Sequence, residues 1–328
     1  MKKDVLVTYE PGEENRKIYR DILEDPARVH YLENKSGSKR IKLLNTVEII
    51  IARSFSQKEI DPKEICLLQN VRFIQLIYAG ADNIPFELIP GNVILASNVG
   101  AFAKPIAEHV LALTLALCKK LIPNNKLLQT GTFDRSGLNQ EIRGGVCGII
   151  GFGGNGREVA RTMQAVGMKV HGINRSGKTD VPIDFIGPAE DLKRVLAASD
   201  VVVITAPLTR ETRDLIGKKE LEWMKKDAIL INVGRGAVVN QRALFEHLKA
   251  HPEFRAGIDT WWSEPAEPGA FKPEYPFFEL TNIIGSPHNA DHVPGSISHA
   301  TGRALQNVKN FLIGSEIRGV LKREDYLA

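Results

Sequence analysis

The chain contains few cysteines. Its 328 residues include three, Cys66, Cys118 and Cys147, which are odd in number, widely spaced and embedded in apolar stretches. A disulfide framework needs paired cysteines and is typical of small secreted domains. The sequence therefore predicts reduced thiols in the core of a cytoplasmic protein.

Long uninterrupted apolar runs are also missing. The most apolar segment, residues 105–122, is interrupted by Glu108 and Lys119, so it predicts a buried helix rather than a membrane span. Near the N-terminus, Asp4 and Pro11 come before any apolar stretch that could serve a signal peptide. We expect neither a signal peptide nor a membrane partner.

The chain has only a small excess of one charge sign. It contains 43 Lys and Arg against 39 Asp and Glu, a net charge of +4, and the two signs are interleaved. The densest basic stretch, KSGSKRIK at residues 35–42, carries no aromatic side chains between its charges. It therefore predicts a solvated loop, and no nucleic-acid partner is expected.

Short runs rich in Val and Ile alternate with helix-like polar segments. They lie at residues 5–10, 47–53, 71–80, 92–97, 145–151, 168–174, 200–207, 227–234, 255–261 and 282–287. A long helix predicted at residues 104–122 separates two such series, and a further helix is predicted at 295–312. Since 328 residues are long for one hydrophobic core, this alternation predicts an α/β fold with two doubly wound parallel-sheet domains.

A glycine-rich turn follows the strand predicted at residues 145–151. Gly151, Gly153 and Gly156 fit the pattern G-x-G-x-x-G, and a helix-forming segment follows them. Such a turn lets the backbone approach a pyrophosphate at the positive end of a helix, and the residue that selects the ribose then falls near Asn174. The turn predicts a dinucleotide cradle, with a glycine-rich connection that holds no ligand as the alternative.

Further polar residues stand at the ends of three later strands. Arg235 follows the strand at 227–234, Asp259 and Glu264 follow the next, and His288 follows the one after. Successive strands of a doubly wound sheet end at the same edge, so these side chains can converge in one crevice. Taken singly, each could be a surface or core residue. His288 and His292 are spaced as H-x-x-x-H, but no cysteine lies near them in the sequence, and no metal site is predicted.

These motifs together closely resemble the D-isomer-specific 2-hydroxyacid dehydrogenase family, and its glyoxylate and hydroxypyruvate reductases in particular. The matching segments are LIYAGADNI (76–84), IAEHVLALTLAL (106–117), GIIGFGGNGREVAR (148–161), TAPLTRETRDLIG (205–217), INVGRGAVVN (231–240), DTWWSEP (259–265) and SPH (286–288). The resemblance implies a Rossmann-type cofactor domain, residues 99–292, inserted into a flavodoxin-like substrate domain formed by residues 1–98 and 293–328. It also implies a homodimer, for which the long apolar helix at 104–122 is the expected contact.

The resemblance assigns roles to individual residues. The catalytic residues it implies are Arg235, Glu264 and His288. Together with the glycine motif and the turn at residues 174–176, it gives these cofactor-binding residues: Gly151, Gly153, Gly154, Asn155, Gly156, Asn174, Arg175, Ser176, Ala206, Pro207, Val233, Gly234 and Asp259. The substrate carboxylate is expected on Ala79, Gly80 and Arg235. In these roles His288 exchanges the proton, Glu264 favours the imidazolium form, and Arg235 binds the carboxylate.

One departure from the family pattern concerns the cofactor. Asn174, Arg175 and Ser176 stand where NAD-dependent members have an acidic residue, which would repel a 2′-phosphate. We therefore expect a preference for NADPH, with NADH still possible.

The sequence predicts an enzyme that transfers a hydride between NAD(P)H and a small 2-oxo acid to give a D-2-hydroxy acid. Two alternatives remain open. A short-form phosphoglycerate dehydrogenase would share the same motifs, and so would a dinucleotide-sensing binding protein built on this fold.

Overall fold

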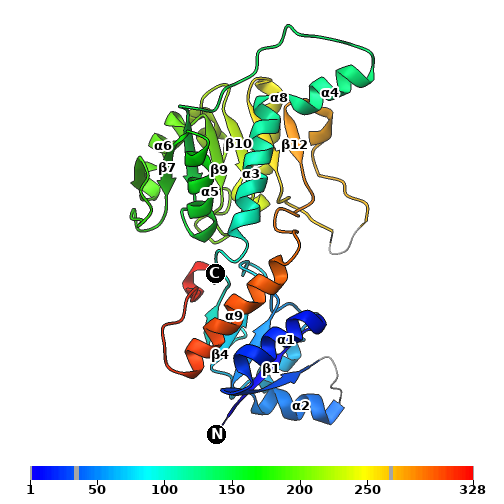
Figure 1. The fold of residues 1–328 in the computed structure, drawn as a ribbon, viewed down its shortest axis with the longest axis vertical. Coiled ribbons are helices and arrows are strands. Elements are labelled where there is room, and N and C mark those ends of the chain that lie inside the picture. Colours follow the sequence, from blue (N-terminus) through cyan, green and yellow to red (C-terminus); the bar gives the residue numbers. More distant parts are fainter. Residues whose placement is uncertain (1, 33–36, 266–268, 328) are drawn as a thin grey trace. The chain divides into compact units, whose positions relative to one another are not determined.

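The computed structural model describes residues 2–32, 37–265 and 269–327. The chain forms two compact units, and each is described by itself (Figure 1). The first unit consists of Met1–Phe102 and Val293–Ala328, and the second unit consists of Ala103–His292. Each contains one sheet in which every strand pair is parallel, which confirms the predicted α/β fold class.

The first unit is built on a five-stranded sheet in the order β2-β1-β3-β4-β5. Its strands are β1 (Lys3–Val7), β2 (Ala27–Tyr31), β3 (Ile49–Ala52), β4 (Phe73–Leu76) and β5 (Ile94–Ala96). Its helices are α1 (Gly12–Leu23), α2 (Gly37–Thr46), η1 (Pro62–Leu67), α9 (Ser296–Leu312) and η5 (Arg323–Asp325). The strand order is that of flavodoxin-like folds. The C-terminal helix α9 belongs to this unit, where it packs against α1 and β4.

The second unit contains a seven-stranded sheet in the order β12-β11-β10-β9-β6-β7-β8. Its strands are β6 (Val146–Ile150), β7 (Lys169–Ile173), β8 (Phe185–Gly187), β9 (Val201–Ile204), β10 (Ile229–Asn232), β11 (Arg255–Ile258) and β12 (Ile283–Gly285). Its helices are α3 (Ala103–Cys118), α4 (Leu121–Gln129), α5 (Gly154–Ala165), η2 (Ala189–Asp191), α6 (Leu192–Ala198), α7 (Lys218–Trp223), η3 (Gly236–Val238), α8 (Gln241–Ala250) and η4 (Phe277–Glu279). The order reverses between β6 and β9, as in Rossmann-type sheets, and ligands bind at such a switch point.

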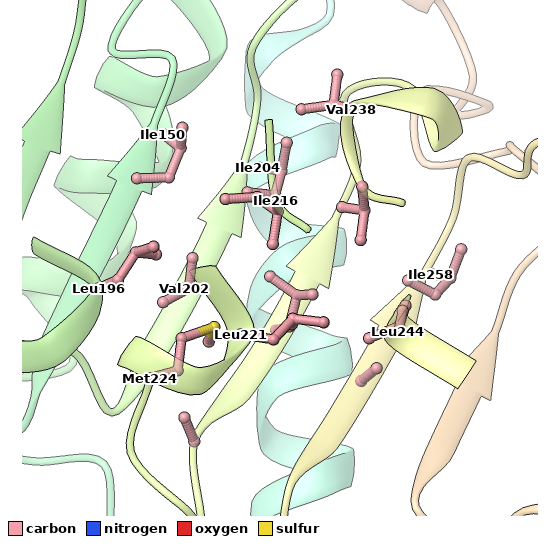
Figure 2. Close-up of a cluster of buried hydrophobic side chains, with 14 of the residues drawn as sticks. Ile150, Leu196, Val202, Ile204, Ile216, Leu221, Met224, Val238, Leu244 and Ile258 are labelled. Atoms are coloured by element: carbon pink, nitrogen blue, oxygen red, sulfur yellow. The ribbon is translucent and has the colours of Figure 1, made fainter. Parts of the chain in front are cut away.

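Both faces of this sheet are covered, which explains why its strands are continuous apolar runs. Because successive side chains of a strand point to opposite faces, Val202 and Ile204 pack with α6, α7 and α8 (Figure 2). Val201 and Val203 belong to the other core, which α3 and α5 complete. All four side chains are fully buried.

The helix predicted at residues 104–122 is interrupted. Helix α3 ends at Cys118, Lys120 takes a left-handed φ of 49°, and α4 begins at Leu121. The physical reason is Pro123, which cannot continue a helix because its ring clashes with the carbonyl four residues earlier and it lacks an N–H, although it is tolerated in a first turn. None of the helices formed by the described residues is long and apolar enough to cross a bilayer.

The prediction of a solvated loop at residues 35–42 is wrong for residues 37–42, which form the start of α2. Lys35 and Ser36 lie outside the described residues. The helix is stabilised by burial of Leu44 and by two hydrogen bonds of 2.6 Å from Arg40 to the carboxylate of Glu64. Lys39 and Lys42 are exposed on this helix, whereas Arg40 is partly buried beside Glu64.

Strands β2 and β8 are absent from the sequence-based prediction. Each forms an edge of its sheet. Strand β2 has the sequence ARVHY and is mostly only partly buried, and β8 has three residues, so neither shows a continuous apolar run. Cys66 is exposed, contrary to the expectation of a core thiol, whereas Cys118 and Cys147 are buried as expected. On η1, the neighbouring Ile65 takes the buried position instead.

Candidate active site

The residues that the sequence analysis singles out in the second unit follow the carboxyl ends of its strands. Gly151–Gly156 follow β6, Asn174–Ser176 follow β7, Ala206 and Pro207 follow β9, Val233–Arg235 follow β10, Asp259 and Glu264 follow β11, and His288 follows β12. Because the sheet is parallel throughout, all of these strand ends lie at one edge. In the first unit, Ala79 and Gly80 likewise lie beyond the carboxyl end of β4.

The glycine turn after β6 is tightly constrained at two positions and open at a third. Gly151 has a φ of 101°, and a Cβ there would lie 2.4 Å from the amide nitrogen of Ala206. A Cβ at Gly156 would lie 2.6 Å from the carbonyl oxygen of Gly151. At Gly153, which precedes the first turn of α5, a Cβ would meet nothing within 4 Å. The turn thus offers an open helix N-terminus with free backbone access, which suits a pyrophosphate.

The turns after β9 and β10 close against this glycine turn. A Cβ at Gly234 would lie 2.7 Å from the carbonyl oxygen of Ala206, so Gly234 and Gly151 approach Ala206 within one cluster. Thr205 donates from Oγ1 to the Gly151 carbonyl oxygen at 2.7 Å. Ala206 and Val233 are buried, whereas Pro207 is exposed. Substitution at either glycine would force these turns apart.

His288 and Glu264 form a hydrogen-bonded pair. Nδ1 of His288 lies 2.8 Å from Oε2 of Glu264, and the other carboxylate oxygen accepts the N–H of Trp261 at 2.8 Å. The two side chains keep exposed fractions of 40% and 35%. Both Glu264 oxygens are therefore held, and Nε2 of His288 is the ring nitrogen left to meet a ligand.

The two pKa values of this pair are shifted in opposite directions. Burial alone would raise the pKa of Glu264, but the hydrogen bond and charge of His288 outweigh it and the pKa is lowered. The pKa of His288 is raised, first by the hydrogen bond to Glu264. Arg235 acts on both groups through its charge, which lowers each pKa. The pair thus favours carboxylate and imidazolium, with a fixed cation close enough to influence both.

Asp259 organises the turn that carries His288. Its side chain is buried, and its carboxylate accepts hydrogen bonds from Ser286 Oγ at 2.6 Å and from the N–H groups of Asn289 and Ala290 at 3.1 and 3.3 Å. Its backbone carbonyl accepts the N–H of His288 at 2.9 Å. The residue expected to line the cofactor also fixes the backbone around His288.

The turn after β7 is closed by its own residues. The amide of Asn174 donates to the carbonyl of Lys178 at 2.8 Å, and Ser176 donates to the Asn174 side-chain oxygen at 3.1 Å. Arg175 reaches across to Glu211, with 3.5 Å between Nη2 and Oε2. The Arg175 side chain remains 54% exposed, so its guanidinium stands at the surface of the turn.

Three residues of this region were not predicted as functional: His109, Ser286 and Glu211. Nε2 of His109, on α3, lies 2.8 Å from Oγ of Ser286, and Glu211 pairs with Arg175. Both contacts join segments far apart in the sequence, and the one available signal was a lone histidine in an apolar helix. Among the described residues no three His, Cys, Asp or Glu side chains gather as a metal site.

Comparison with known proteins agrees with this geometry. Residues 111–290 match the model of the D-isomer specific 2-hydroxyacid dehydrogenase family, NAD binding domain. The chain is 30% identical to the glyoxylate reductase of Pyrococcus furiosus over 278 residues, which is 82% of this chain and 81% of that protein.

A second relative and one solved structure extend the comparison. The chain is 31% identical over 268 residues to the D-3-phosphoglycerate dehydrogenase of Archaeoglobus fulgidus, covering 79% of this chain but only 49% of that protein, about half its length. The crystal structure of a putative formate dehydrogenase from Pyrobaculum aerophilum superimposes with a TM-score of 0.84 at 27% identity and covers 100% of both chains.

The family model spans more than half of the chain, and a relative at 30% identity is matched over most of its length. The predictions of an oxidoreductase with a Rossmann-type domain for a nicotinamide dinucleotide are thereby confirmed. The matched residues 111–290 include the glycine turn, the start of α5 and the His288–Glu264 pair. The chain belongs to the D-isomer specific 2-hydroxyacid dehydrogenase family.

Proposed function

We propose that this protein reduces a small 2-oxo acid, such as glyoxylate or hydroxypyruvate, to the D-2-hydroxy acid with NAD(P)H. The observation that carries the proposal is the His288–Glu264 hydrogen bond of 2.8 Å, formed at the same sheet edge as the glycine turn. Relatives named glyoxylate reductase and, in Thermotoga maritima, hydroxypyruvate reductase support this substrate class.

The dinucleotide, when bound, supplies the hydride. His288 supplies the proton to the substrate oxygen from Nε2, because Nδ1 is engaged by Glu264. Glu264 holds the imidazole in one tautomer and stabilises the imidazolium that reduction requires. In the reverse direction, the neutral form of His288 takes the proton back.

Arg235 supplies a permanent positive charge for the substrate carboxylate. A guanidinium offers paired donors that match a carboxylate, and its charge also polarises the neighbouring carbonyl. We assign the backbone N–H groups of Ala79 and Gly80 to the same carboxylate. In this proposal residues 1–98 and 293–328 form the substrate domain, and residues 99–292 form the cofactor domain.

We propose cofactor-binding roles for residues that follow the carboxyl ends of the strands. Gly151, Gly153, Gly154, Asn155 and Gly156 would hold the pyrophosphate. Asn174, Arg175 and Ser176 would bind the adenosine ribose, and the rest of the dinucleotide would be held by Ala206, Pro207, Val233, Gly234 and Asp259. We propose that NADPH is preferred, since the half-exposed guanidinium of Arg175 can bind a 2′-phosphate and Asn174 does not repel one.

We propose that the protein is a homodimer, and we move the expected contact from the helix predicted at residues 104–122 to α4 and the segment after it. Helix α3 buries its apolar face within the second unit, whereas α4 has no buried residue. Figure 1 shows α4 and the following segment standing away from the sheet of their unit. Leu128, Phe133 and Leu138 there are 56%, 79% and 87% exposed. Exposed apolar side chains in such a concentration mark an interface.

Light scattering tests the homodimer at micromolar concentration. We expect twice the chain mass, and a double substitution of Phe133 and Leu138 by Ser should shift the protein towards monomer. A monomeric mass for the unaltered protein would contradict the proposal. A cytoplasmic location, and the absence of nucleic-acid and membrane partners, stay predictions.

The function itself is tested with a panel of 2-oxo acids. Purified protein is mixed with NADPH or NADH and with glyoxylate, hydroxypyruvate, pyruvate or phosphohydroxypyruvate, and oxidation of the cofactor is followed by absorbance. We expect the highest kcat/KM with glyoxylate or hydroxypyruvate. A clear preference for the phosphorylated acid would favour phosphoglycerate dehydrogenase, and dinucleotide binding without any turnover would favour a dinucleotide sensor.

A further inference from the structure

The backbone of His288 is held in an unfavourable conformation. Its φ is 50°, in the left-handed region that non-glycine residues rarely adopt. Such a conformation persists only where surrounding contacts determine it. Here the contacts are hydrogen bonds to Asp259. Its backbone carbonyl accepts the N–H of His288, and its carboxylate accepts the N–H groups of Asn289 and Ala290. The direction of the His288 ring thus depends on where Asp259 is held.

Asp259 is itself held by a side chain, Ser286, that connects it to α3. Ser286 Oγ lies 2.6 Å from Asp259 Oδ1 and 2.8 Å from His109 Nε2. A carboxylate only accepts hydrogen bonds, so the single hydroxyl hydrogen of Ser286 goes to Asp259. The hydroxyl oxygen must then accept from His109, which requires the tautomer with hydrogen on Nε2. These hydrogen bonds link His109 on α3, through Ser286 and Asp259, to the turn that carries His288.

We propose that His109 is a positioning residue for the reaction: through Ser286 and Asp259 it fixes the turn that presents His288. The proposal rests on the assignment of His288 as the proton donor under the proposed function. Nε2 of His109 lies 3.6 Å from Oδ1 of Asp259, which is too far for a hydrogen bond. His109 therefore orients this carboxylate through Ser286. An apolar residue at this place would leave Ser286 Oγ without its donor and free to rotate away from Asp259.

The test compares His109→Leu with His109→Gln. Leucine removes the donor, whereas the glutamine amide can still donate to Ser286. Thr114→Val is the matched control, since it disturbs the same helix by removing a buried hydrogen bond of 2.7 Å to the Val110 carbonyl. For each variant we would measure kcat, KM for glyoxylate, dinucleotide Kd and Tm.

We expect kcat to fall by about 10- to 100-fold in His109→Leu, as a misplaced reacting group does. Dinucleotide Kd should change much less, because Asp259 is only one of the residues assigned to the cofactor. His109→Gln should recover most of the loss, and Thr114→Val should keep the original kcat even if its Tm falls. Ser286→Ala combined with His109→Leu should be no worse than the more damaging single change, because both break one chain of bonds.

Two results would overturn the inference. One is an unchanged kcat in His109→Leu. The other is an equal loss in the leucine and glutamine variants together with an equal fall in Tm, which would show a purely structural role. His288→Ala is run in parallel: if it retains full activity, the proposed function fails as well, whereas its inactivity beside an active His109→Leu would refute the role of His109 alone.

Discussion

Two turns at the same edge of the seven-stranded sheet are built in opposite ways. The turn after β12, which carries His288, is held from outside by Asp259 and by the link from Ser286 to His109. The turn after β7, which carries Arg175, is closed by bonds among its own residues. Proton transfer depends on exact geometry, whereas attraction of a phosphate depends mainly on charge. The externally held turn suits the proton transfer proposed for His288, and the self-closed turn suits the phosphate binding proposed for Arg175.

The two turns also differ in the solvent exposure of the side chains that support them. Asp259 is 1% exposed, whereas the side chains of Arg175 and Glu211 are 54% and 74% exposed. A buried hydrogen-bonded group cannot be altered without cost, and an exposed charge pair contributes little free energy. We therefore expect substitutions at the His288 turn to change the rate of reaction strongly, and substitutions at the Arg175 turn to change the choice of cofactor more modestly.

The largest effect is expected for His288→Ala. Loss of general acid catalysis should lower kcat for ketone reduction by about 10²–10⁴-fold. Dinucleotide Kd, measured by quenching of tryptophan fluorescence, should change little because the proton is needed only at the reacting atoms. Retention of full activity would remove His288 from its assigned role, and a parallel loss of dinucleotide binding would mean that the turn had collapsed.

Glu264→Gln should act through the pH profile, with a smaller loss of rate at neutral pH. Reduction needs protonated His288, so its rate falls as pH rises through the pKa of that group. Glu264 raises this pKa by its hydrogen bond and charge, and the neutral amide removes the charge. The decline should therefore begin at lower pH in the variant, in a plot of log kcat against pH. An unchanged profile would show that Glu264 does not set the protonation of His288.

The sequence was sufficient for the buried centre of each sheet and for the ends of its strands. Val201–Ile204 form a continuous apolar run because both faces are covered, and Gly151 and Gly156 stand where a Cβ would collide with neighbouring backbone. These features depend on local constraints that residue types express directly.

Contacts between distant segments could not be predicted in this way. His109 and Ser286 are 177 positions apart, and their hydrogen bond exists only because α3 packs across β11 and β12. Similarly, α2 became a helix because tertiary contacts of Leu44 and Arg40 outweighed its weak local pattern. The side chains that support a site, unlike those that perform its chemistry, carry little signature of their own.

The exposed turn is tested first by the combined change Asn174→Asp and Arg175→Ala. One charge-assisted hydrogen bond contributes about 1.5–3 kcal/mol, or roughly ten- to 150-fold in affinity. The ratio of kcat/KM with NADPH to that with NADH should fall by a factor in this range, while kcat with NADH stays close to that of the unaltered protein. A ratio that does not move, or an original preference for NADH, would refute the assignment of this turn.

The smallest effect is expected at Glu211. Its carboxylate lies 3.5 Å from the guanidinium of Arg175, so a 2′-phosphate that binds Arg175 must compete with it. Glu211→Gln removes this competitor, and an exposed pair of this kind contributes up to about 1 kcal/mol, or roughly fivefold. KM for NADPH should therefore fall by at most about that factor, KM for NADH should not change, and the difference should shrink as salt is added.

A matched control separates this pair from the general loss of a negative charge. Glu222 on α7 is also exposed and lies 3.9 Å from Lys218, so Glu222→Gln makes the same change of net charge at another exposed pair. It should leave both cofactor KM values unaltered. If Glu211→Gln and Glu222→Gln lower the KM for NADPH equally, the effect belongs to the overall field of the protein. If only Glu211→Gln lowers it, the exposed pair tunes the choice of cofactor without touching the geometry that His288 requires.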